Sequence, residues 1–310
     1  MALGRNVRLL YEEAMPSSHR RGFFLFWLAV ALMIGVPACK DGSALPLVRL
    51  TEARRIAAEL RLAFRQAANA SNRAVMADTD EASIAFAAEA EQAKKTVRSD
   101  VDAIRPLLSD LGYDDETRAL DDFEKRFAEY ETLDHSVLEL AVENTNLKAQ
   151  GLSFGPIRDD ARAFRAALDL VAKAAKPSTR CPIASAVASA EIAIADIQVL
   201  HAPHIAEAND AEMTRLENEM TALEASARGA LGTLSGLVEP ASQADMAAAT
   251  SALDRFEATH AKLIALSRRN SNVRSQALSL GKMLALSGAC DVSLAALSDG
   301  LAKRGFNATR

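Results

Sequence analysis

Histidines and carboxylates follow one another closely at one point in the second half of the chain, and their spacing could suit a metal ion. His201, His204 and Glu207 recur every three residues, which would place them roughly on one side of a helix. Imidazole and carboxylate groups are a donor set that zinc accepts, and Pro203 between them would kink such a helix. The competing interpretation is a solvated kink with two ordinary surface histidines, because no third histidine or cysteine lies nearby. We therefore predict no metal and no other cofactor.

A second pattern, Glu257-x-x-His260, matches the element that di-iron bundles use. Those proteins need two such elements, and the stretch from Glu131 to Asp134 in the first half has its histidine one residue too late, at His135. The sequence also contains no glycine-rich phosphate loop and no Gly-x-Ser-x-Gly motif. We therefore expect a protein that is not an enzyme, with no catalytic residues.

The three cysteines suggest two different kinds of covalent chemistry. Residues 36–39, Val-Pro-Ala-Cys, follow a basic pair and an apolar stretch, and they resemble a bacterial lipobox in which Cys39 would be lipidated. The alternatives are an uncleaved membrane anchor and a twin-arginine export signal at residues 20–24, and translation could start at Met15 rather than Met1. In an oxidising compartment Cys181 and Cys290 would form a disulfide, the alternative being two buried free thiols.

The overall composition indicates long helices. Apolar residues make up 49% of the 310 residues but aromatics only 5%, and glycine (14) and proline (9) are sparse. Small, unbranched, helix-favouring side chains with few turn formers predict an all-α fold of long elements. The net charge of −5 is interleaved along the chain, which is typical of a solvated helical surface and gives no indication of nucleic-acid binding.

Apolar residues recur at intervals of three and four from residue 47 onward. They predict helices at about 47–76, 80–112, 114–155, 157–175, 183–208, 210–237, 241–281 and 283–303. Gly155-Pro156 is expected to break the chain between the third and fourth helices, because proline disfavours helix in the residue before it.

The two halves contain a common motif. Aligned without gaps, residues 139–155 and 265–281 share leucine, two asparagines, glutamine, leucine, serine and glycine, at 140/266, 144/270, 146/272, 150/276, 152/278, 153/279 and 155/281. Shared composition alone would not place these residues in register, so we interpret the match as an internal duplication. It predicts two tandem up-down four-helix bundles at 40–176 and 183–310, joined by a linker at 177–182 and preceded by a signal or anchor at 1–39.

Asn144 and Asn270 fall on the apolar stripes of their helices, and Lys148 and Arg274 follow one turn later. An amide inside a bundle needs a hydrogen-bond partner. Two interpretations stay open: a polar contact within the protein that fixes helix register, or a small ligand or ordered water held between helices beside the positive charge. We take Asn144, Lys148, Asn270 and Arg274 as candidate ligand-binding residues.

The pattern Leu140-Ala141-x-x-Asn144-x-Asn146-x-Lys148-Ala149-Gln150-x-Leu152-Ser153 on a long third helix resembles the periplasmic four-helix-bundle sensor domains of methyl-accepting chemotaxis receptors. The resemblance covers 47–176 and, less closely, 183–303, and the tandem plan is similar to the bimodular helical sensors of that group. It implies binding of small metabolites or periplasmic proteins and dimer formation. The sequence shows no second span and no cytoplasmic signalling hairpin, and the family's ligand-contacting arginines have no secure counterpart here.

These observations predict an exported, lipid-anchored, chemoreceptor-like sensor module on the periplasmic side of a bacterial membrane. Its partner would be a small molecule or an envelope protein, with no nucleic acid, and it could form a homodimer. The alternatives are a structural or adaptor lipoprotein of the cell envelope and a metal-binding protein that uses the His201 region.

Overall fold

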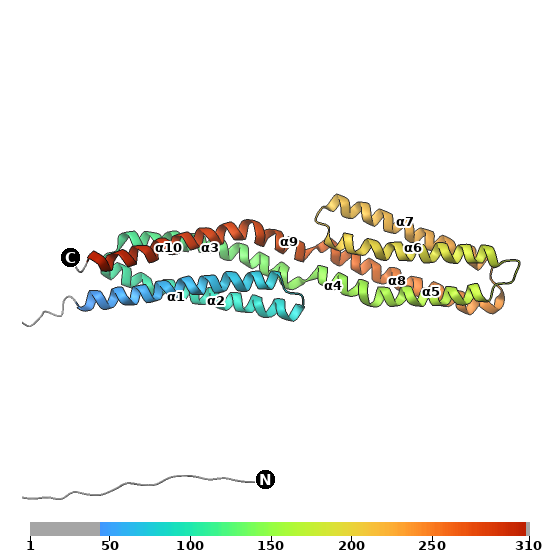
Figure 1. The fold of residues 1–310 in the computed structure, drawn as a ribbon, viewed down its shortest axis with the longest axis horizontal. Helices are drawn as coiled ribbons and strands as arrows, with labels where there is room; N and C mark the ends of the chain where they lie inside the picture. Colours follow the sequence, from blue (N-terminus) through green and yellow to red (C-terminus); the bar gives the residue numbers. More distant parts are fainter. Residues whose placement is uncertain (1–43, 308–310) are drawn as a thin grey trace, which may run out of the picture. The chain divides into compact units, whose positions relative to one another are not determined.

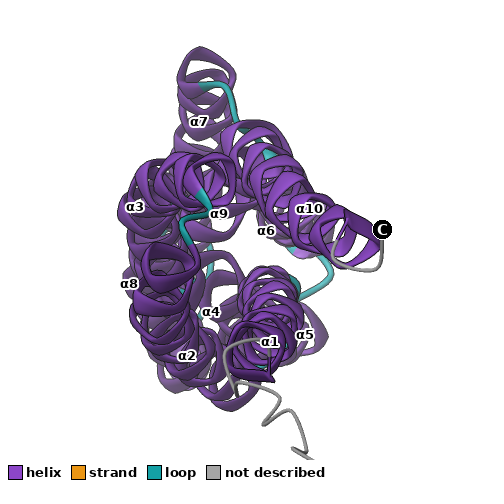
Figure 2. Cartoon of the chain, turned by 90° about the vertical axis from the view of Figure 1, so that its left-hand side faces the viewer, coloured by secondary structure: helices purple, strands orange, loops and turns teal. Residues whose placement is uncertain are grey.

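The computed structural model describes residues 44–307, and all regular structure in that range is helical (Figures 1 and 2). The all-α prediction is therefore confirmed. Cys39 and the rest of the predicted export signal lie outside the described residues.

In chain order the elements are α1 (Ala44–Val75), α2 (Asp80–Leu111), α3 (Asp114–Glu143), α4 (Thr145–Leu152), η1 (Ser153–Ile157), α5 (Arg158–Lys173), α6 (Arg180–Ala206), α7 (Asp210–Ser235), η2 (Pro240–Ser242), α8 (Gln243–Arg269), α9 (Ser271–Leu278), η3 (Ser279–Met283) and α10 (Leu284–Asn307). Polar residues mark several of their ends. The Thr79 hydroxyl accepts from Ala82 N at the start of α2, and the Asn209 carboxamide does the same for Ala211 N and Glu212 N at the start of α7. Gly112 ends α2 with a φ of 66°, a conformation that glycine adopts without strain.

Buried apolar side chains form two separate cores. The first core lies between α1, α2, α3 and α10, and it includes Phe64, Phe123, Phe127 and Tyr130 in mutual ring contact. The second lies between α5, α6, α7 and α8, with Phe164 and Phe256 as its buried phenylalanines. Figure 1 shows these two groups of helices end to end within the described chain.

This arrangement corrects the expected division at 177–182. The helix before that turn, α5, and the helix after it, α6, both belong to the second core, whereas α10 at the end of the chain packs against α1 and α3. Each half of the duplication therefore contributes its fourth helix to the other half's core. The reason is that two long helical paths, 114–173 and 243–307, each run from one core to the other (Figure 1).

The two long paths are interrupted earlier than predicted. Each helix ends at an asparagine with positive φ, Asn144 (49°) and Asn270 (54°), and a new helix starts at the next residue. Asparagine tolerates this left-handed conformation better than most other residues with a side chain. The expected break at Gly155-Pro156 is confirmed as a kink, because Gly155 has non-helical backbone angles (φ −104°, ψ −106°), and α5 follows it directly.

The structure repeats these irregularities in the register of the aligned motif. Asn270 lies 126 residues after Asn144, and η3 (Ser279–Met283) lies 126 residues after η1 (Ser153–Ile157). Because a non-glycine residue with positive φ is uncommon, the recurrence of this conformation at Asn144 and Asn270, in register, is what a duplication predicts.

Two helical stretches of the described chain, 180–206 and 240–304, are long and apolar enough to cross a membrane, judged by length and composition alone. Helices that fill a protein core have the same length and composition, and α6 contributes Ile183, Ile194 and Ile197 to the second core.

Candidate functional site

The predicted asparagines, Asn144 and Asn270, lie where the two long paths meet and hydrogen-bond to other groups of the protein. Asn146 Nδ2 donates to Asn270 Oδ1, and Asn272 Nδ2 donates to Asn144 Oδ1, each at 2.8 Å. Asn270 Nδ2 in turn donates to the carbonyl of Glu207 at 2.7 Å. Asn144 and Asn270 are buried, as their positions on the apolar stripes predicted.

At this junction α4 and α9 cap each other. The backbone N–H of Thr145 donates to Ser271 Oγ, and that of Ser271 donates to Thr145 Oγ1, both at 3.0 Å. The N–H groups of Asn146 and Asn272 likewise donate to each other's side-chain oxygens, both at 3.1 Å. The first N–H groups of a helix have no partner within the helix, so each helix supplies the cap that the other lacks.

The two cations of the predicted site do not join this network. Lys148 Nζ donates to the Glu143 carbonyl at 2.7 Å and lies 3.3 Å from Asp80, while the exposed Arg274 side chain makes no ion pair among the described residues. The structure thus brings together the two asparagines of the predicted set but not the two cations. The amides join the two groups of helices.

The junction yields a first testable expectation. Replacing Asn270 by alanine removes its hydrogen bonds to Asn146 and Glu207 and leaves at positive φ a residue that tolerates this conformation less well than asparagine. We expect a loss of about 2 kcal/mol or more in the free energy of unfolding by urea. Asn270→Gly loses the same bonds without the backbone strain, so it should be the more stable variant by about 1 kcal/mol. Equal losses would show that the backbone conformation contributes nothing.

The histidines of the predicted metal motif are buried in the second core. His201 Nε2 lies 2.9 Å from His260 Nδ1, and His201 Nδ1 lies 3.0 Å from Ser153 Oγ. The described residues contain no group of three or more histidines, cysteines or carboxylates arranged to hold a metal ion. Glu207 instead accepts from the backbone N–H of Asn209, and the interpretation as a solvated kink with two surface histidines is wrong, because both histidines are buried.

A second chain of polar groups runs from His204 to the surface. His204 Nδ1 lies 2.8 Å from Ser267 Oγ, and His204 Nε2 lies 2.9 Å from Glu217, whose carboxylate Arg268 holds in two hydrogen bonds. Arg268 first, and His204 to a lesser extent, lowers the pKa of Glu217. Although serine, histidine and carboxylate resemble a nucleophilic triad, Ser267 is fully buried and donates to the His204 carbonyl. Its role is to satisfy the polar groups of a helix end.

His260 has a counterpart of different chemistry in the first core. Asp134 precedes it by 126 residues, and both side chains are buried on the third helix of their half. Asp134 accepts from Lys94 Nζ at 2.6 Å and from Ser71 Oγ at 2.5 Å. Burial would lower the pKa of Lys94, but the adjoining carboxylates of Asp134 and Glu91 raise it overall. Each core thus contains one polar layer at the same level, ionic in the first and imidazole-based in the second.

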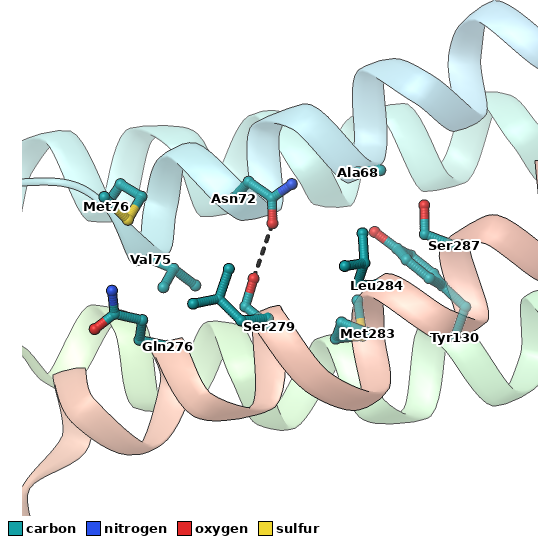
Figure 3. A pocket seen from close by; sticks show the side chains of 11 residues that line it. Ala68, Asn72, Val75, Met76, Tyr130, Gln276, Ser279, Met283, Leu284 and Ser287 are labelled. Carbon is teal, nitrogen blue, oxygen red and sulfur yellow. Dashed lines mark hydrogen bonds between the residues drawn. The ribbon is translucent and has the colours of Figure 1, made fainter.

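A cavity of about 220 Å³ opens beside the ionic layer, and we call it the α1–α10 cavity. Its apolar lining consists of Ala68, Val75, Met76, Leu280, Met283 and Leu284, and its polar lining consists of Asn72, Tyr130, Gln276, Ser279 and Ser287. Figure 3 shows that these side chains come from α1 on one side and from the segment 276–287 on the other, with Tyr130 entering from α3. Ser279 Oγ donates to Asn72 Oδ1 at 2.9 Å across it.

Tyr130 is the most informative residue of this lining. Its side chain is 1% exposed, and its hydroxyl lies beside Ser71 and Asp134 without a hydrogen bond of regular geometry to any described residue. Figure 3 shows its hydroxyl end directed towards α1. Burial, and after it the charge of Asp134, raises the pKa of the phenol, so the group is a neutral donor. Buried hydroxyls in native proteins are rarely left without a partner.

Sequence reasoning missed Tyr130 because it fitted the apolar stripe of its helix. Its hydroxyl could have drawn attention to this position, because a tyrosine in a core usually has a hydrogen-bond partner for its hydroxyl. Gln276 and Ser279 were part of the aligned motif, but periodicity could not place them opposite α1.

A second hollow, of about 540 Å³, lies over the ionic layer on the other side of α3. It is lined by Glu91, Lys94, Arg98, Ala128, Glu131, Thr132 and His135, and Arg98 pairs with Glu131. This hollow is a surface groove lined by side chains of both charges.

The cysteines do not form the predicted disulfide. Both are free, Cys181 being exposed at the start of α6 and Cys290 buried in the first core. The helix swap explains this, because it places the two residues with different cores. Burial raises the pKa of the Cys290 thiol to about 12, so this thiol is protonated and unreactive.

Fold and site together define an all-α, multi-helix protein whose described residues form a polar layer in each core and a mainly apolar cavity beside the first. No protein-family model, curated protein or solved structure matches the chain.

Proposed function

We propose that this protein binds a small molecule in the α1–α10 cavity and serves as an exported, lipid-anchored, sensor-like module of a bacterial envelope. The observation that carries the binding proposal is the buried Tyr130 hydroxyl, which has no regular hydrogen bond and faces a cavity large enough for a ligand. The export and anchoring follow from residues 20–39, and the sensing role from the resemblance to chemoreceptor sensor domains.

The position of the cavity suits such a role. Its two walls come from the first helix and from segment 276–287, which belong to opposite ends of the sequence and meet only in the folded chain. A ligand bound between them would hold α10 against α1, and therefore the second half of the chain against the first. Binding to the folded state alone also raises stability by mass action.

Isothermal titration calorimetry with a panel of small organic acids, amino acids, amines, alcohols and ketones tests the proposal. Ala68 is half-buried in the cavity wall on α1, so Ala68→Leu should fill the space and abolish the saturable heats. Ala58→Leu makes the same change at an exposed site of the same helix and should leave binding unchanged. If no compound gives a saturable heat or raises the melting temperature, the binding function is refuted.

The second candidate function is a structural or adaptor protein that presents its helices to other envelope proteins. It is favoured by the junction, where Asn144 Oδ1 and both polar atoms of the Asn270 side chain hydrogen-bond to other parts of the protein. It predicts a silent panel and capture of an envelope partner that survives the Ala68→Leu change.

A further inference from the structure

The ligand site proposed above is defined by side chains that carry no charge. None of the 11 residues lining the α1–α10 cavity carries a charge at neutral pH. The Tyr130 phenol is the only group among them that can ionise, and burial raises its pKa. The polar groups available to a ligand are hydroxyls and carboxamides, namely those of Tyr130, Asn72, Gln276, Ser279 and Ser287. Such groups orient a ligand but supply no counter-ion.

The nearest buried charges are already paired. Lys94 Nζ lies 2.6 Å from Asp134 and 2.7 Å from Glu91, and Asp134 also accepts from Ser71. A charged ligand beside Tyr130 would therefore lose its hydration without gaining an opposite charge. Burying an unpaired ion costs several kcal/mol, whereas a neutral polar group with one hydrogen bond costs far less.

The size and lining of the cavity limit the ligand further. An apolar cavity of roughly 150 Å³ can hold one benzene molecule, so about 220 Å³ accommodates a single ring with a short substituent. Six of the lining side chains are apolar, and Met76 and Met283 supply adaptable thioethers. The Tyr130 hydroxyl is available to donate to an acceptor of the ligand, such as a carbonyl, ether or hydroxyl oxygen.

We propose that the ligand of the α1–α10 cavity is a small uncharged molecule, with one aromatic or alicyclic ring and one oxygen that accepts a hydrogen bond from Tyr130. This inference rests on the proposed function, because it names the chemical class bound at the same site. It sets the cavity apart from sites for organic acids, which depend on a cation in the lining.

Titration of the full chain at pH 7.5 with ring compounds of similar size and different charge tests the proposal. Benzyl alcohol and acetophenone are the neutral probes, benzoate is the anion and benzylammonium the cation. We expect saturable calorimetric heats for the neutral pair and binding at least tenfold weaker for both ions. Ala68→Leu should abolish binding of the neutral probes, and Ala58→Leu should not.

Tyr130→Phe tests the hydrogen bond separately. The second core has a phenylalanine at the equivalent place, Phe256, so the ring without its hydroxyl suits this position of the fold. We expect the variant to bind acetophenone three- to tenfold more weakly and to keep its melting temperature. Unchanged affinity would overturn the assigned hydrogen bond.

The outcomes separate the two proposals. Benzoate or benzylammonium binding as tightly as benzyl alcohol, and lost in Ala68→Leu, would overturn the neutral class while the binding function stands. Ion binding that persists in Ala68→Leu would place the ion elsewhere, for example in the groove over Lys94, and would leave the neutral class supported by the neutral probes alone. Silence from every probe, together with silence from the wider panel, would overturn both proposals.

Discussion

Replacing Lys94 by methionine should cost about 3–5 kcal/mol in the free energy of unfolding at pH 7.5, because it leaves the buried Asp134 carboxylate without its cation. Methionine matches the length of the lysine stem, so packing changes little and the loss reports the charge. Urea denaturation followed by circular dichroism at 222 nm measures it. Lys95→Met, at an exposed neighbouring position, should change stability by less than about 0.5 kcal/mol.

The loss in Lys94→Met should shrink as the pH falls. Burial already raises the pKa of Asp134, opposed by Lys94, and without the ammonium that pKa rises further. A carboxyl whose pKa is higher in the folded state than in the unfolded state binds more protons when folded, so the variant gains stability towards acid. The difference from wild type should therefore be smaller at pH 5 than at pH 7.5.

The double variant Lys94→Met, Asp134→Leu provides the control. Removing both charges leaves no buried ion, and we expect it to recover most of the lost stability. If Lys94→Met alone is as stable as Lys95→Met, or if the double variant is no better than the single one, the ion pair does not have the energetic role assigned to it here.

The sequence predicted the helices well because their signal is local. Spacing of apolar residues specifies which face of a helix is buried, and Thr79, Asn209 and Gly112 mark helix ends by chemistry that acts within one turn. The buried state of Asn144 and Asn270 followed from the same periodicity. None of these inferences requires knowing which helices become neighbours.

The sequence could not predict which helices pack against each other. The apolar stripe of α10 is compatible with either core, so periodicity could not show that it packs against α1. The contact of His201 with His260 joins residues 59 apart, and both lie on stripes that predicted nothing more than burial. The α1–α10 cavity is harder still, because its existence depends on the space that side chains leave unfilled.

The positive-φ asparagines illustrate a third kind of limit. The spacing of apolar residues through Tyr130 and Val137 continues after Asn144, so the sequence predicts one helix, although the backbone is interrupted at Asn144. The break is stable because Ser271 and Asn272 of the other half satisfy the freed N–H groups. Only the duplication, through its shared asparagines, gave a hint of this mutual dependence.

Between pH 7 and pH 5 the chain should lose stability, because His201 and His260 are neutral in the folded protein. Burial first, and then the nearby imidazoles, lowers the pKa of His201 to about 3, and burial lowers that of His260 to about 4. Unfolded histidine binds a proton near pH 6.5, so below that pH the unfolded state takes up protons that the folded state excludes. The stability is complete above about pH 6.5 and falls by about 1.4 kcal/mol per pH unit for each imidazole.

Other ionisable groups near His201 and His260 change how steeply the stability falls with pH but do not reverse the fall. Glu224 lies 3.8 Å from His260, and burial raises its pKa, which gives a gain towards acid of the opposite sign. Glu217 and Arg268 face His204 rather than the pair, and the lowered pKa of Glu217 acts only below the usual range of carboxyl groups. The window from pH 7 to pH 5 is therefore dominated by the two imidazoles.

Urea unfolding across this window, with hydrogen exchange to locate the change, measures the effect. Protection should fall in α6 and α8, and the variant His201→Leu, His260→Leu should flatten the pH dependence, because leucine removes both titrating groups from the core. His135→Leu, at an exposed histidine of α3, should leave the wild-type slope intact. If the wild-type free energy of unfolding does not change between pH 7 and pH 5, or if the double variant loses as much stability over this range as the wild type, the imidazole pair is charged or hydrated in the folded protein. Burial would then not explain the polar layer of the second core.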